Sequence, residues 1–291
     1  MVDYIISAAS TADLPVEYFN EHNIPLISYT YIVDNEPFID DCLEESRKML
    51  FKRMKEGAIT STSMINTYAY HEFFKKLMDT GKDVIFLDMT KKISHSFYNA
   101  MEAAEQIQNE YPNQRFYLMD TNCVSGGLGL LLQNMVQLRD AGKKFDQVIA
   151  WGEANKLKII HWFTVDDLNY LKRGGRVSNT AALVGTIFSI KPVLYVSNEG
   201  ELVSGLKIHG RRKALLEIIE RMKEDFTEPD GKEVLINHAD CLEDAEFMRQ
   251  KVLETFPTIS KISIMSLGGV VGSHCGPGLF TIFYLGNKRY T

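Results

Sequence analysis

Short apolar runs alternate with amphipathic stretches through the first half of the chain. Residues 4–7 and 83–88 predict buried strands, and residues 26–33 are rich in β-branched and aromatic side chains, which also favours a strand. Because these runs alternate with helical patterns over short links, we expect a parallel sheet covered on both faces. The other predicted elements of this half are helices over 43–55, 68–78, 96–110 and 128–139, and a strand over 116–119.

In the second half, strands and helices do not alternate regularly. Asn198-Glu199-Gly200 lies between two apolar runs and predicts a hairpin. The mixed order of elements around it predicts a two-layer domain whose sheet is partly antiparallel. The predicted strands are 159–165, 191–196, 201–208, 233–237, 261–266 and 279–285, and the predicted helices are 166–171, 179–188, 211–226 and 241–254.

These patterns predict an α/β fold with a parallel-sheet N-terminal domain and a second, two-layer α/β domain with a mixed sheet. A chain of 291 residues exceeds one ordinary core, so two domains are expected. We place the boundary in the polar stretch 153–158, which gives an N-terminal domain over 1–158 and a C-terminal domain over 159–291.

Composition and charge narrow the functional classes. A net charge of −6 disfavours general nucleic-acid binding, which needs many cations at phosphates. The four cysteines form no CxxC pair, which is typical of reduced thiols in a cytosol. The N-terminus has no basic region followed by a long apolar run, and no apolar stretch reaches the roughly 18 residues of a spanning helix. We expect a soluble, cytoplasmic protein.

Hydroxyl side chains gather at two places near predicted helix starts. Thr62 and Ser63 come before the helix over 68–78, and Ser94 follows the strand over 83–88. Ligands of open α/β sheets bind where strand carboxyl ends meet helix N-termini, and hydroxyls there can donate to a small anion. The structural alternative for each is a plain helix N-cap.

One histidine, His274, lies in a glycine-rich segment over 268–278 that we interpret as a turn. Glycines such as Gly272 and Gly276 permit positive φ angles and close approach of the backbone to a ligand head group. A neutral imidazole donates one hydrogen bond, and a protonated one adds a positive charge. The structural alternative is a histidine fixed in a tight turn between two strands.

Motifs for nucleotide, metal or hydrolytic chemistry are weak or missing in the sequence. Residues 125–129 (SGGLG) precede a helix but lack the third glycine and the later acid of a dinucleotide site, so close helix–sheet packing is the better interpretation. There is no G-x-S-x-G elbow, no phosphate-binding GxxxxGK[ST] loop and no HExxH spacing. We therefore expect no catalytic residue, no metal and no cofactor.

Two basic clusters stand out on this acidic chain. The first contains Lys172, Arg173 and Arg176, and the second surrounds Arg211 within residues 207–213. They are either a solvated face or a docking surface for an acidic partner or an anionic membrane.

Taken together, these segments resemble the DegV family of bacterial fatty-acid-binding proteins, which includes the FakB-type subunits of fatty acid kinase. The most specific stretch is YLKRGGRVS at 170–178, continuing through 190–194 to 210–214. Residues 10–15 (STADLP) are similar to the family's N-terminal motif, and residues 272–278 (GSHCGPG) to its C-terminal motif. The match runs over nearly the whole chain.

The resemblance implies a long-chain fatty acid, such as palmitate, in a tunnel between and within the two domains. It implies that the family's Thr-Ser motif falls on Thr62-Ser63, with Thr60-Ser61 as the alternative register. The carboxylate-binding serine then falls on Ser94 and the glycine-loop histidine on His274. It further implies a fatty acid kinase catalytic subunit as partner, transient membrane contact and a place in phospholipid metabolism.

Several residues depart from the family pattern. Ala9 replaces an acid, and Met64 stands where glutamine is common. Lys91 and Lys92 replace small residues, and His95 replaces a glycine. The carboxylate donors remain, whereas two lysines near the head group can alter the choice of ligand or partner.

We expect a lipid-binding protein that presents a fatty acid to a kinase, not an enzyme. Two other classes stay open. A Ser/His hydrolase using Ser94 and His274 would turn over ester substrates. A nucleotide- or sugar-phosphate-binding regulator using the same anion donors would respond to phosphate competition.

Overall fold

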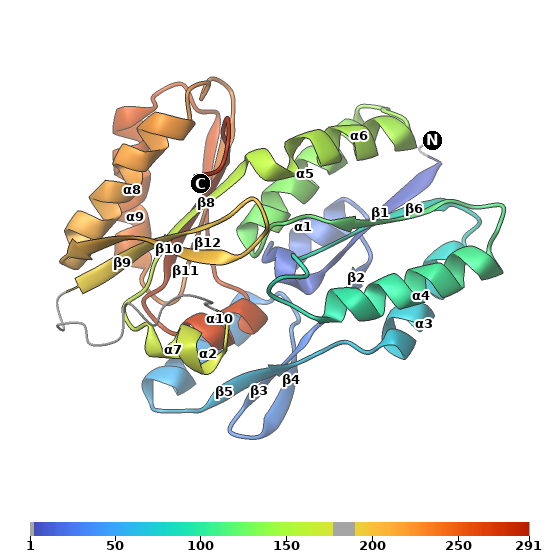
Figure 1. The fold of residues 1–291 in the computed structure, drawn as a ribbon, viewed down its shortest axis with the longest axis horizontal. Helices are drawn as coiled ribbons and strands as arrows, with labels where there is room; N and C mark the ends of the chain where they lie inside the picture. The colour runs from blue at the N-terminus through green and yellow to red at the C-terminus, as the bar shows by residue number, and fades with distance from the viewer. Residues whose placement is uncertain (1–2, 177–189, 291) are drawn as a thin grey trace.

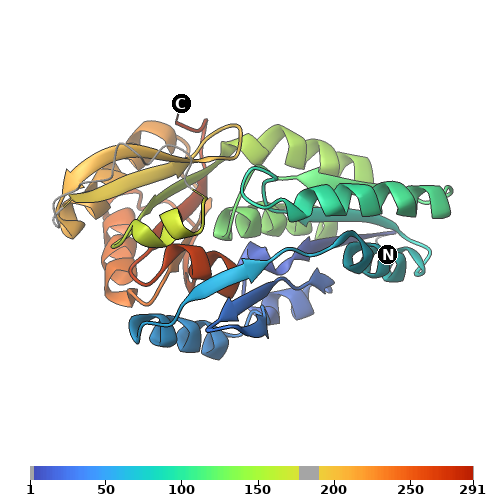
Figure 2. The ribbon, with the colours of Figure 1, turned by 60° about the horizontal axis from the view of Figure 1, so that its bottom comes forward.

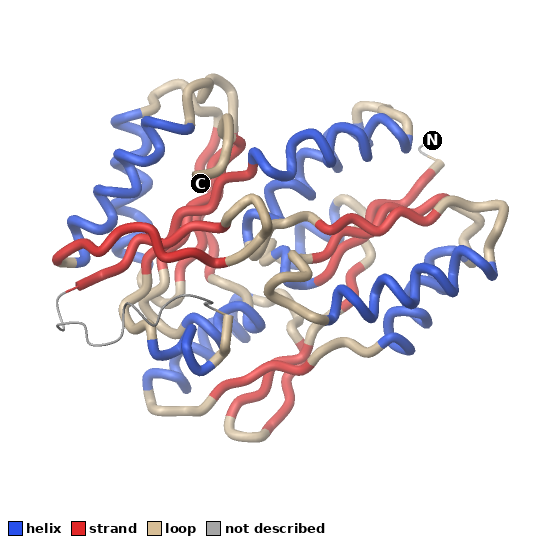
Figure 3. Tube along the Cα trace, viewed as in Figure 1, coloured by secondary structure: helices blue, strands red, loops and turns tan. Residues whose placement is uncertain are grey.

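A computed structural model describes residues 3–176 and 190–290 of the chain. Two large sheets, each packed against helices, lie on either side of the molecule, and a small third sheet lies along its lower edge in Figure 1. Figure 3 shows the strands of the two large sheets running across the molecule with helices on their outer faces. The helix predicted over 179–188 lies outside the described residues.

The N-terminal sheet is parallel, as the alternation of strands and helices predicts. Its strands are β1 (Tyr4–Ala9), β2 (Leu26–Ile27), β6 (Asp83–Asp88) and β7 (Phe116–Asp120), in the order β2-β1-β6-β7. Its helices are α1 (Val16–Glu21), α3 (Thr67–Met78), α4 (Ser96–Glu110), α5 (Gly126–Asp140) and α6 (Phe145–Asn155). Figure 1 shows α3 and α4 on one side of the sheet and α5 and α6 on the other. Cover on both faces explains why Val84, Ile85 and Phe86 are fully buried.

The single strand predicted over residues 26–33 is wrong. After β2 the chain leaves the parallel sheet at Tyr29, whose N–H donates to the Ser10 hydroxyl at 3.2 Å. It then enters a separate antiparallel sheet in the order β4-β3-β5. The strands of this sheet are β3 (Thr30–Val33), β4 (Glu36–Ile39) and β5 (Thr60–Ser63), and α2 (Glu44–Lys55) connects β4 to β5.

The helix predicted over 68–78 is confirmed, but Thr62 and Ser63 do not cap it. Both residues lie on β5, paired with β3. Helix α3 begins four residues later, where the Asn66 side chain accepts a hydrogen bond from the Ala69 N–H at 2.8 Å. The hydroxyls of Thr62 and Ser63 are therefore free of any capping role.

The C-terminal sheet is mixed, and its hairpin is confirmed. Its strands are β8 (Ile159–Thr164), β9 (Ile190–Val196), β10 (Leu202–His209), β11 (Glu233–His238), β12 (Lys261–Ser266) and β13 (Phe280–Leu285). They pair in the order β10-β9-β8-β13-β11-β12, with β9 and β10 antiparallel. Helices α8 (Arg211–Asp225) and α9 (Leu242–Thr255) cover its outer face, and the short helix η2 (Lys156–Lys158) leads into β8.

Side chains alternate across this sheet because successive residues of a strand face opposite sides. On β8, Ile160 and Trp162 join the outer core beneath α8 and α9. His161 and Phe163 face inward, toward the N-terminal half. The neighbouring strands β9 and β13 alternate in the same way. The sheet is thus buried on both faces, and its inner face meets the rest of the molecule.

The glycine-rich segment near the C-terminus forms a helix, which corrects the predicted turn. Helix α10 (Gly269–Cys275) lies in the middle of the molecule, above the three-stranded sheet in Figure 2. A Cβ on Gly269 would come within 2.6 Å of the Tyr31 ring, and one on Gly272 within 2.7 Å of the Phe51 ring. Close packing thus overrides the poor helix propensity of glycine. Positive φ begins only after the helix, at Gly276 (75°).

Two further helices differ from the predictions. Helix α7 covers Asn169–Arg173 instead of 166–171. Helix α6 fills part of the stretch 153–158 that we interpreted as polar linker. Its apolar residues Phe145 and Val148 are buried, while the charged residues on its other face gave the stretch a loop-like composition.

Glycines at the start of α5 allow that helix to pack closely on the C-terminal sheet. A Cβ on Gly126 would lie 2.2 Å from Asn237 Oδ1, and one on Gly127 would lie 2.0 Å from His161 Nε2. The packing interpretation of residues 125–129 is therefore confirmed. The contact joins a helix of the N-terminal half to strands of the C-terminal half.

A buried arginine also ties the two halves together. Arg289 is 2% exposed. Its guanidinium donates to the carbonyl oxygens of Asn122 (2.7 Å), Lys156 (3.0 Å), Ile159 (3.0 Å) and Ser197 (2.7 Å). These carbonyls belong to the loop after β7, helix η2, the start of β8 and the β9–β10 turn. One side chain thus holds segments of both large sheets.

We expect Arg289→Met to lower the free energy of unfolding by about 3 kcal/mol, because several buried carbonyls lose their donor at once. Urea denaturation measures the change. Arg249→Met, at an exposed arginine paired with Glu246, is the matched control and should cost less than about 0.5 kcal/mol. Similar losses in both variants would contradict the role assigned to Arg289.

Candidate functional site

A cavity lies where the parallel strands end against the inner face of the six-stranded sheet. Its empty volume is about 850 Å³, open solvent at its mouth included. Figure 1 shows β1 and β6 running toward the C-terminal sheet. Ligands of open α/β sheets bind at this position, outside the carboxyl ends of the strands.

Most of the cavity wall is apolar. Phe163, Val196 and Phe283 come from the inner face of the C-terminal sheet. Leu171 of α7 and Val270 of α10 contribute from the opposite side. The other apolar lining residues are Met64, Met89, Ile93, Val124, Leu202, Leu267, Val271, Cys275 and Leu279. A wall of this composition favours a long hydrocarbon over a polar ligand.

Polar side chains also line the cavity, and they include Tyr29, Ser125, His161 and Thr281 besides the four predicted residues. Thr62 Oγ1 lies 2.8 Å from His274 Nε2, and Ser63 and Ser94 line the same cavity. Thr60 turns away and donates to the Ser273 carbonyl at 2.7 Å, which joins β5 to α10. The Thr62-Ser63 register thus faces the cavity, whereas Thr60 is structural. The structure brings together all four residues predicted to bind a carboxylate.

His274 is held neutral at physiological pH. Burial, reinforced by the positive charge of Arg176, lowers the pKa of its imidazole to about 4. Arg176 lines the cavity, and its Nε donates to the Ile93 carbonyl at 3.4 Å, next to Ser94. Gly174 packs on the imidazole, since a Cβ there would lie 2.4 Å from Nδ1. The positive charge near the hydroxyls therefore comes from Arg176, not from the histidine.

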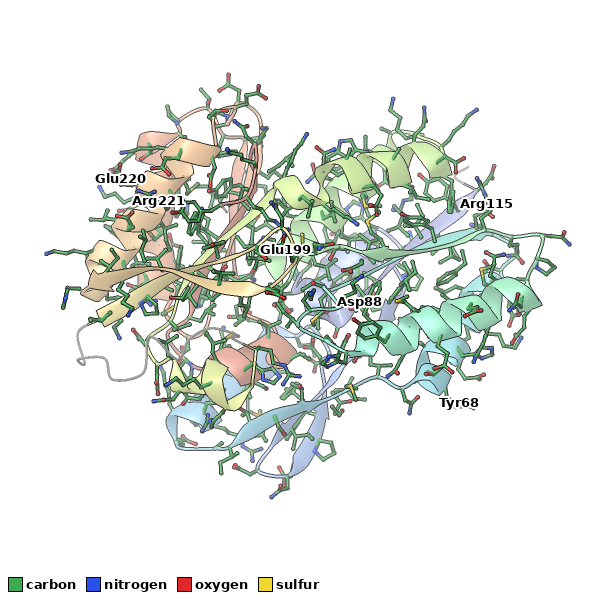
Figure 4. The ribbon with its side chains drawn as sticks, viewed as in Figure 1. Tyr68, Asp88, Arg115, Glu199, Glu220 and Arg221 are labelled. Atoms are coloured by element: carbon green, nitrogen blue, oxygen red, sulfur yellow. The ribbon has the colours of Figure 1, made fainter. Side chains whose placement is uncertain are left out.

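Ser94 and Tyr29 both line the cavity and belong to a buried hydrogen-bond group. Its Oγ lies 3.3 Å from the Tyr29 hydroxyl, which lies 3.3 Å from both carboxylate oxygens of Asp88. Tyr70 donates to Asp88 Oδ2 at 2.7 Å. Figure 4 shows Asp88 near the centre of the molecule, between its two halves. Burial raises the pKa of this carboxyl to about 7.

Helix α10 is fixed by a second buried polar group. Arg47 donates to the carbonyls of Asp13 (3.3 Å), Leu14 (3.0 Å) and Ser266 (2.9 Å). Ser125 donates to Asp13 Oδ2 at 2.5 Å. Burial raises the pKa of Asp13 to about 7, against the opposing effect of the Arg47 charge. These contacts connect the first loop, α2, α5 and the residues before α10.

The arginines of the two predicted basic clusters lie in three different environments. Arg173 is exposed and lies over the Tyr170 ring, with 4.7 Å between its guanidinium carbon and the ring centroid. Arg176 lines the cavity, as described above. Arg211 is largely buried and pairs with Asp244 at 2.9 Å and Asp166 at 3.8 Å. Of the three, only Arg173 presents its charge freely to solvent.

Sequence reasoning assigned no role to Tyr29 or Asp88 and placed Arg176 on a docking surface. For Asp88 a signal was available, because an acidic residue ends a buried strand just before Ser94. For Tyr29 there was none, because its position depends on the break between β2 and β3. Arg176 belongs to a run of cationic residues, and such a run predicts a solvated face equally well.

The geometry does not form a serine–histidine pair. In the described hydrogen bonds, Ser94 contacts Tyr29 and the Ser96 N–H, while His274 contacts Thr62. A neutral histidine with a depressed pKa is also a weak general base.

Within residues 3–176 and 190–290, no group of three His, Cys, Asp or Glu side chains is arranged to hold a metal ion. Over the same ranges, every helix is too short or too polar to cross a membrane.

Comparison with known proteins gives a consistent result. The family described as uncharacterised proteins of the DegV family matches residues 5–287. A DegV domain-containing protein of Clostridium perfringens is 34% identical over 290 residues, covering 99% of each chain. A fatty-acid-binding DegV family protein of Streptococcus agalactiae is 25% identical, with a TM-score of 0.84 over 99% of this chain and 100% of that one. A fatty-acid-binding DegV family protein of Thermus thermophilus is 23% identical, with a TM-score of 0.88 over 98% and 99% of the two chains.

Proposed function

The chain belongs to the DegV family, and on this premise we propose that it binds a long-chain fatty acid in its central cavity. The tail lies against the apolar wall formed by the C-terminal sheet, α7 and α10. The carboxylate lies near Thr62, Ser63, Ser94 and His274. The observation that carries the proposal is a single cavity whose wall is mostly apolar and that also contains these four polar side chains.

The energetics assign selectivity to the head group. Burying some fourteen methylenes of a palmitate tail contributes about 11 kcal/mol, at roughly 0.8 kcal/mol per CH₂. A bilayer offers a similar gain per methylene. Tail burial alone therefore cannot extract the lipid from a membrane. The donors around the carboxylate must supply the difference.

The residues present are suited to that task. A buried carboxylate without partners is far too costly, so each lost water must be replaced by a donor. Thr62, Ser63 and Ser94 supply hydroxyls, and neutral His274 supplies one ring N–H. Arg176 supplies a full positive charge on the same wall. Lys91 and Lys92 pair with Asp120 and Glu201, so the two departures from the family pattern lie in salt bridges rather than at the head group.

We assign the protein a non-catalytic role in which the bound carboxylate is presented to a kinase. Ser63 and Met64 line the cavity and are exposed, so the head-group region reaches the surface. A partner kinase would transfer a phosphoryl group from ATP to the carboxylate, giving an acyl phosphate and ADP. Exposed Arg173 lies on α7, beside the cavity, and is the arginine suited to guide docking.

The two rival functions make different use of the site. A hydrolase needs Ser94 activated by His274, but each is hydrogen-bonded elsewhere. A p-nitrophenyl esterase activity that Ser94→Ala abolishes would support this function.

A phosphate-binding regulator would prefer several cations, whereas Arg176 is the one Lys or Arg among the described lining residues. Displacement of fatty acid by millimolar phosphate would support that function.

We expect Ser94→Ala and His274→Ala each to weaken palmitate binding by about tenfold or more, because each removes a hydrogen bond to a charged group worth roughly 1.5–3 kcal/mol. Displacement of a fluorescent fatty acid measures the affinity, and thermal melting checks the fold. Ser260→Ala and His22→Ala, at residues that do not line the cavity, are the matched controls. Unchanged affinity in both site variants, with folding intact, would refute the head-group assignment.

For the partner role, we expect Arg173→Glu to slow acyl-phosphate formation by a purified fatty acid kinase catalytic subunit while leaving palmitate affinity unchanged. The reversal replaces an attractive charge with a repulsive one at the docking surface. Arg249→Glu on α9 is the control for a general loss of positive charge. Arg211 is less suitable, since its reversal breaks the pair with Asp244. Full turnover with Arg173→Glu would remove that residue from the interface.

A further inference from the structure

An uninterrupted chain of hydrogen-bonding groups leads from the cavity wall to a buried carboxyl. It runs from Ser94 through Tyr29 to Asp88, with 3.3 Å between successive oxygens. Asp88 is fully buried and Tyr29 is 2% exposed. No Lys or Arg hydrogen-bonds to Asp88 among the described residues, and its fixed donors are Tyr70 at 2.7 Å and the Met89 N–H at 2.7 Å. Burial without a cationic partner favours the protonated form of this carboxyl.

The protonation state of Asp88 sets the direction of the chain. Tyr29 has one hydroxyl hydrogen. If Asp88 is ionised, Tyr29 donates to it, and the Tyr29 oxygen attracts the Ser94 hydrogen away from the cavity. If Asp88 is protonated, it donates to Tyr29, Tyr29 donates to Ser94, and the Ser94 hydrogen is free to point into the cavity. The second arrangement is therefore the one in which Ser94 adds its own hydrogen bond to those of the other donors on the wall.

We propose that Asp88 is a positioning residue that takes up a proton when the ligand carboxylate binds, and that this proton turns Tyr29 and Ser94 so that Ser94 donates to the carboxylate. The proposal rests on the proposed fatty-acid function. Charge repulsion acts in the same direction, since two anions separated by only two hydroxyl groups in a buried site destabilise each other. The proton comes from solvent and stays on Asp88, and no bond of the ligand changes.

Among the groups of this hydrogen-bond chain and those around it that contact the ligand site, Asp88 is the one whose protonation changes near neutral pH. The pKa of Asp88 is about 7, and a bound carboxylate raises it further. His274, with a pKa of about 4, stays neutral, and burial raises the pKa values of Tyr29 and Tyr70 far above this range. Asp120 lies nearest on β7 and is paired with Lys91 at 3.4 Å.

Another buried carboxyl, Asp13, also has a pKa of about 7 and contacts the cavity-lining Ser125. It lies in the group that fixes α10 and has no hydrogen bond to Ser94 among the described contacts. Arg176 is the charged group of the wall that faces the ligand and does not titrate here.

Isothermal titration calorimetry with decanoate at pH 8, in two buffers of different ionisation enthalpy, counts the protons exchanged on binding. Decanoate is ionised before binding at this pH, since alkyl carboxyls titrate near 4–5. We expect the wild type to take up close to one proton per ligand, because Asp88 is mostly ionised beforehand and protonated afterwards. Asp88→Asn should take up almost none, since its amide donates permanently toward Tyr29. Asp120→Asn is the matched control and should behave as the wild type.

The pH dependence of affinity gives an independent readout that needs no variant to fold. Wild-type affinity for decanoate should fall by up to about tenfold per pH unit above pH 7, and Asp88→Asn should remove that slope. Tyr29→Phe cuts the chain and should weaken binding at pH 7 while flattening the same slope.

The outcomes separate this inference from the proposed function. If the wild type binds decanoate with no proton uptake, with the same uptake as Asp88→Asn, or with an affinity that is constant from pH 7 to 9, the proton-coupled role of Asp88 is refuted and fatty-acid binding stands. If the wild type binds neither decanoate nor palmitate at any pH, the proposed function itself fails.

Discussion

The site depends on helix α10, which can pack at the centre of the protein only because it has glycines where a side chain would not fit. Gly269 and Gly272 of α10 leave room for the rings of Tyr31 and Phe51, and any Cβ there would collide with them. The same helix carries His274 at its end and contributes Val270 to the apolar wall. The position of His274 and the shape of part of the apolar wall are therefore set by one close-packed element. A side chain added on its glycines would move both together.

Buried electrostatics organise the rest. Asp13 and Arg47 fix the start of α10, and Asp88 lies behind Ser94 with no cationic hydrogen-bond partner in the described part of the chain. Burial raises the pKa of both carboxyls to about 7, while burial and Arg176 lower that of His274. The result is a cavity wall that carries hydroxyl groups, a neutral imidazole and, among the described lining residues, one guanidinium. Such a region accommodates a single negative charge.

Much of the fold could be predicted from the sequence, where the spacing of apolar residues matches that of a strand or a helix. The parallel sheet, the β9–β10 hairpin and helices such as Ser96–Glu110 follow directly from the local pattern. The break between β2 and β3 could not be predicted, because β-branched and aromatic residues occur on both sides of it and the chain turns at Tyr29 through a contact with Ser10. Helix α10 was missed because glycine propensity opposes a helix and only tertiary packing forms it.

The candidate site follows the same division. Thr62, Ser63, Ser94 and His274 were identified from hydroxyl clusters and family resemblance, and they do lie on one cavity. Tyr29 and Asp88 were not, since their roles arise from contacts across long sequence distances. Arg176 was assigned to the surface because its neighbours Lys172 and Arg173 are basic, while the fold turns it to the cavity wall.

Native mass spectrometry of the purified protein, followed by organic extraction, tests the central claim most directly. The account predicts a stoichiometric mass shift that is released as free long-chain fatty acid, with Ser94→Ala and His274→Ala retaining less of it. A protein that carries no lipid and also refuses added palmitate would contradict the account and favour a phosphate-bearing ligand at the same donors.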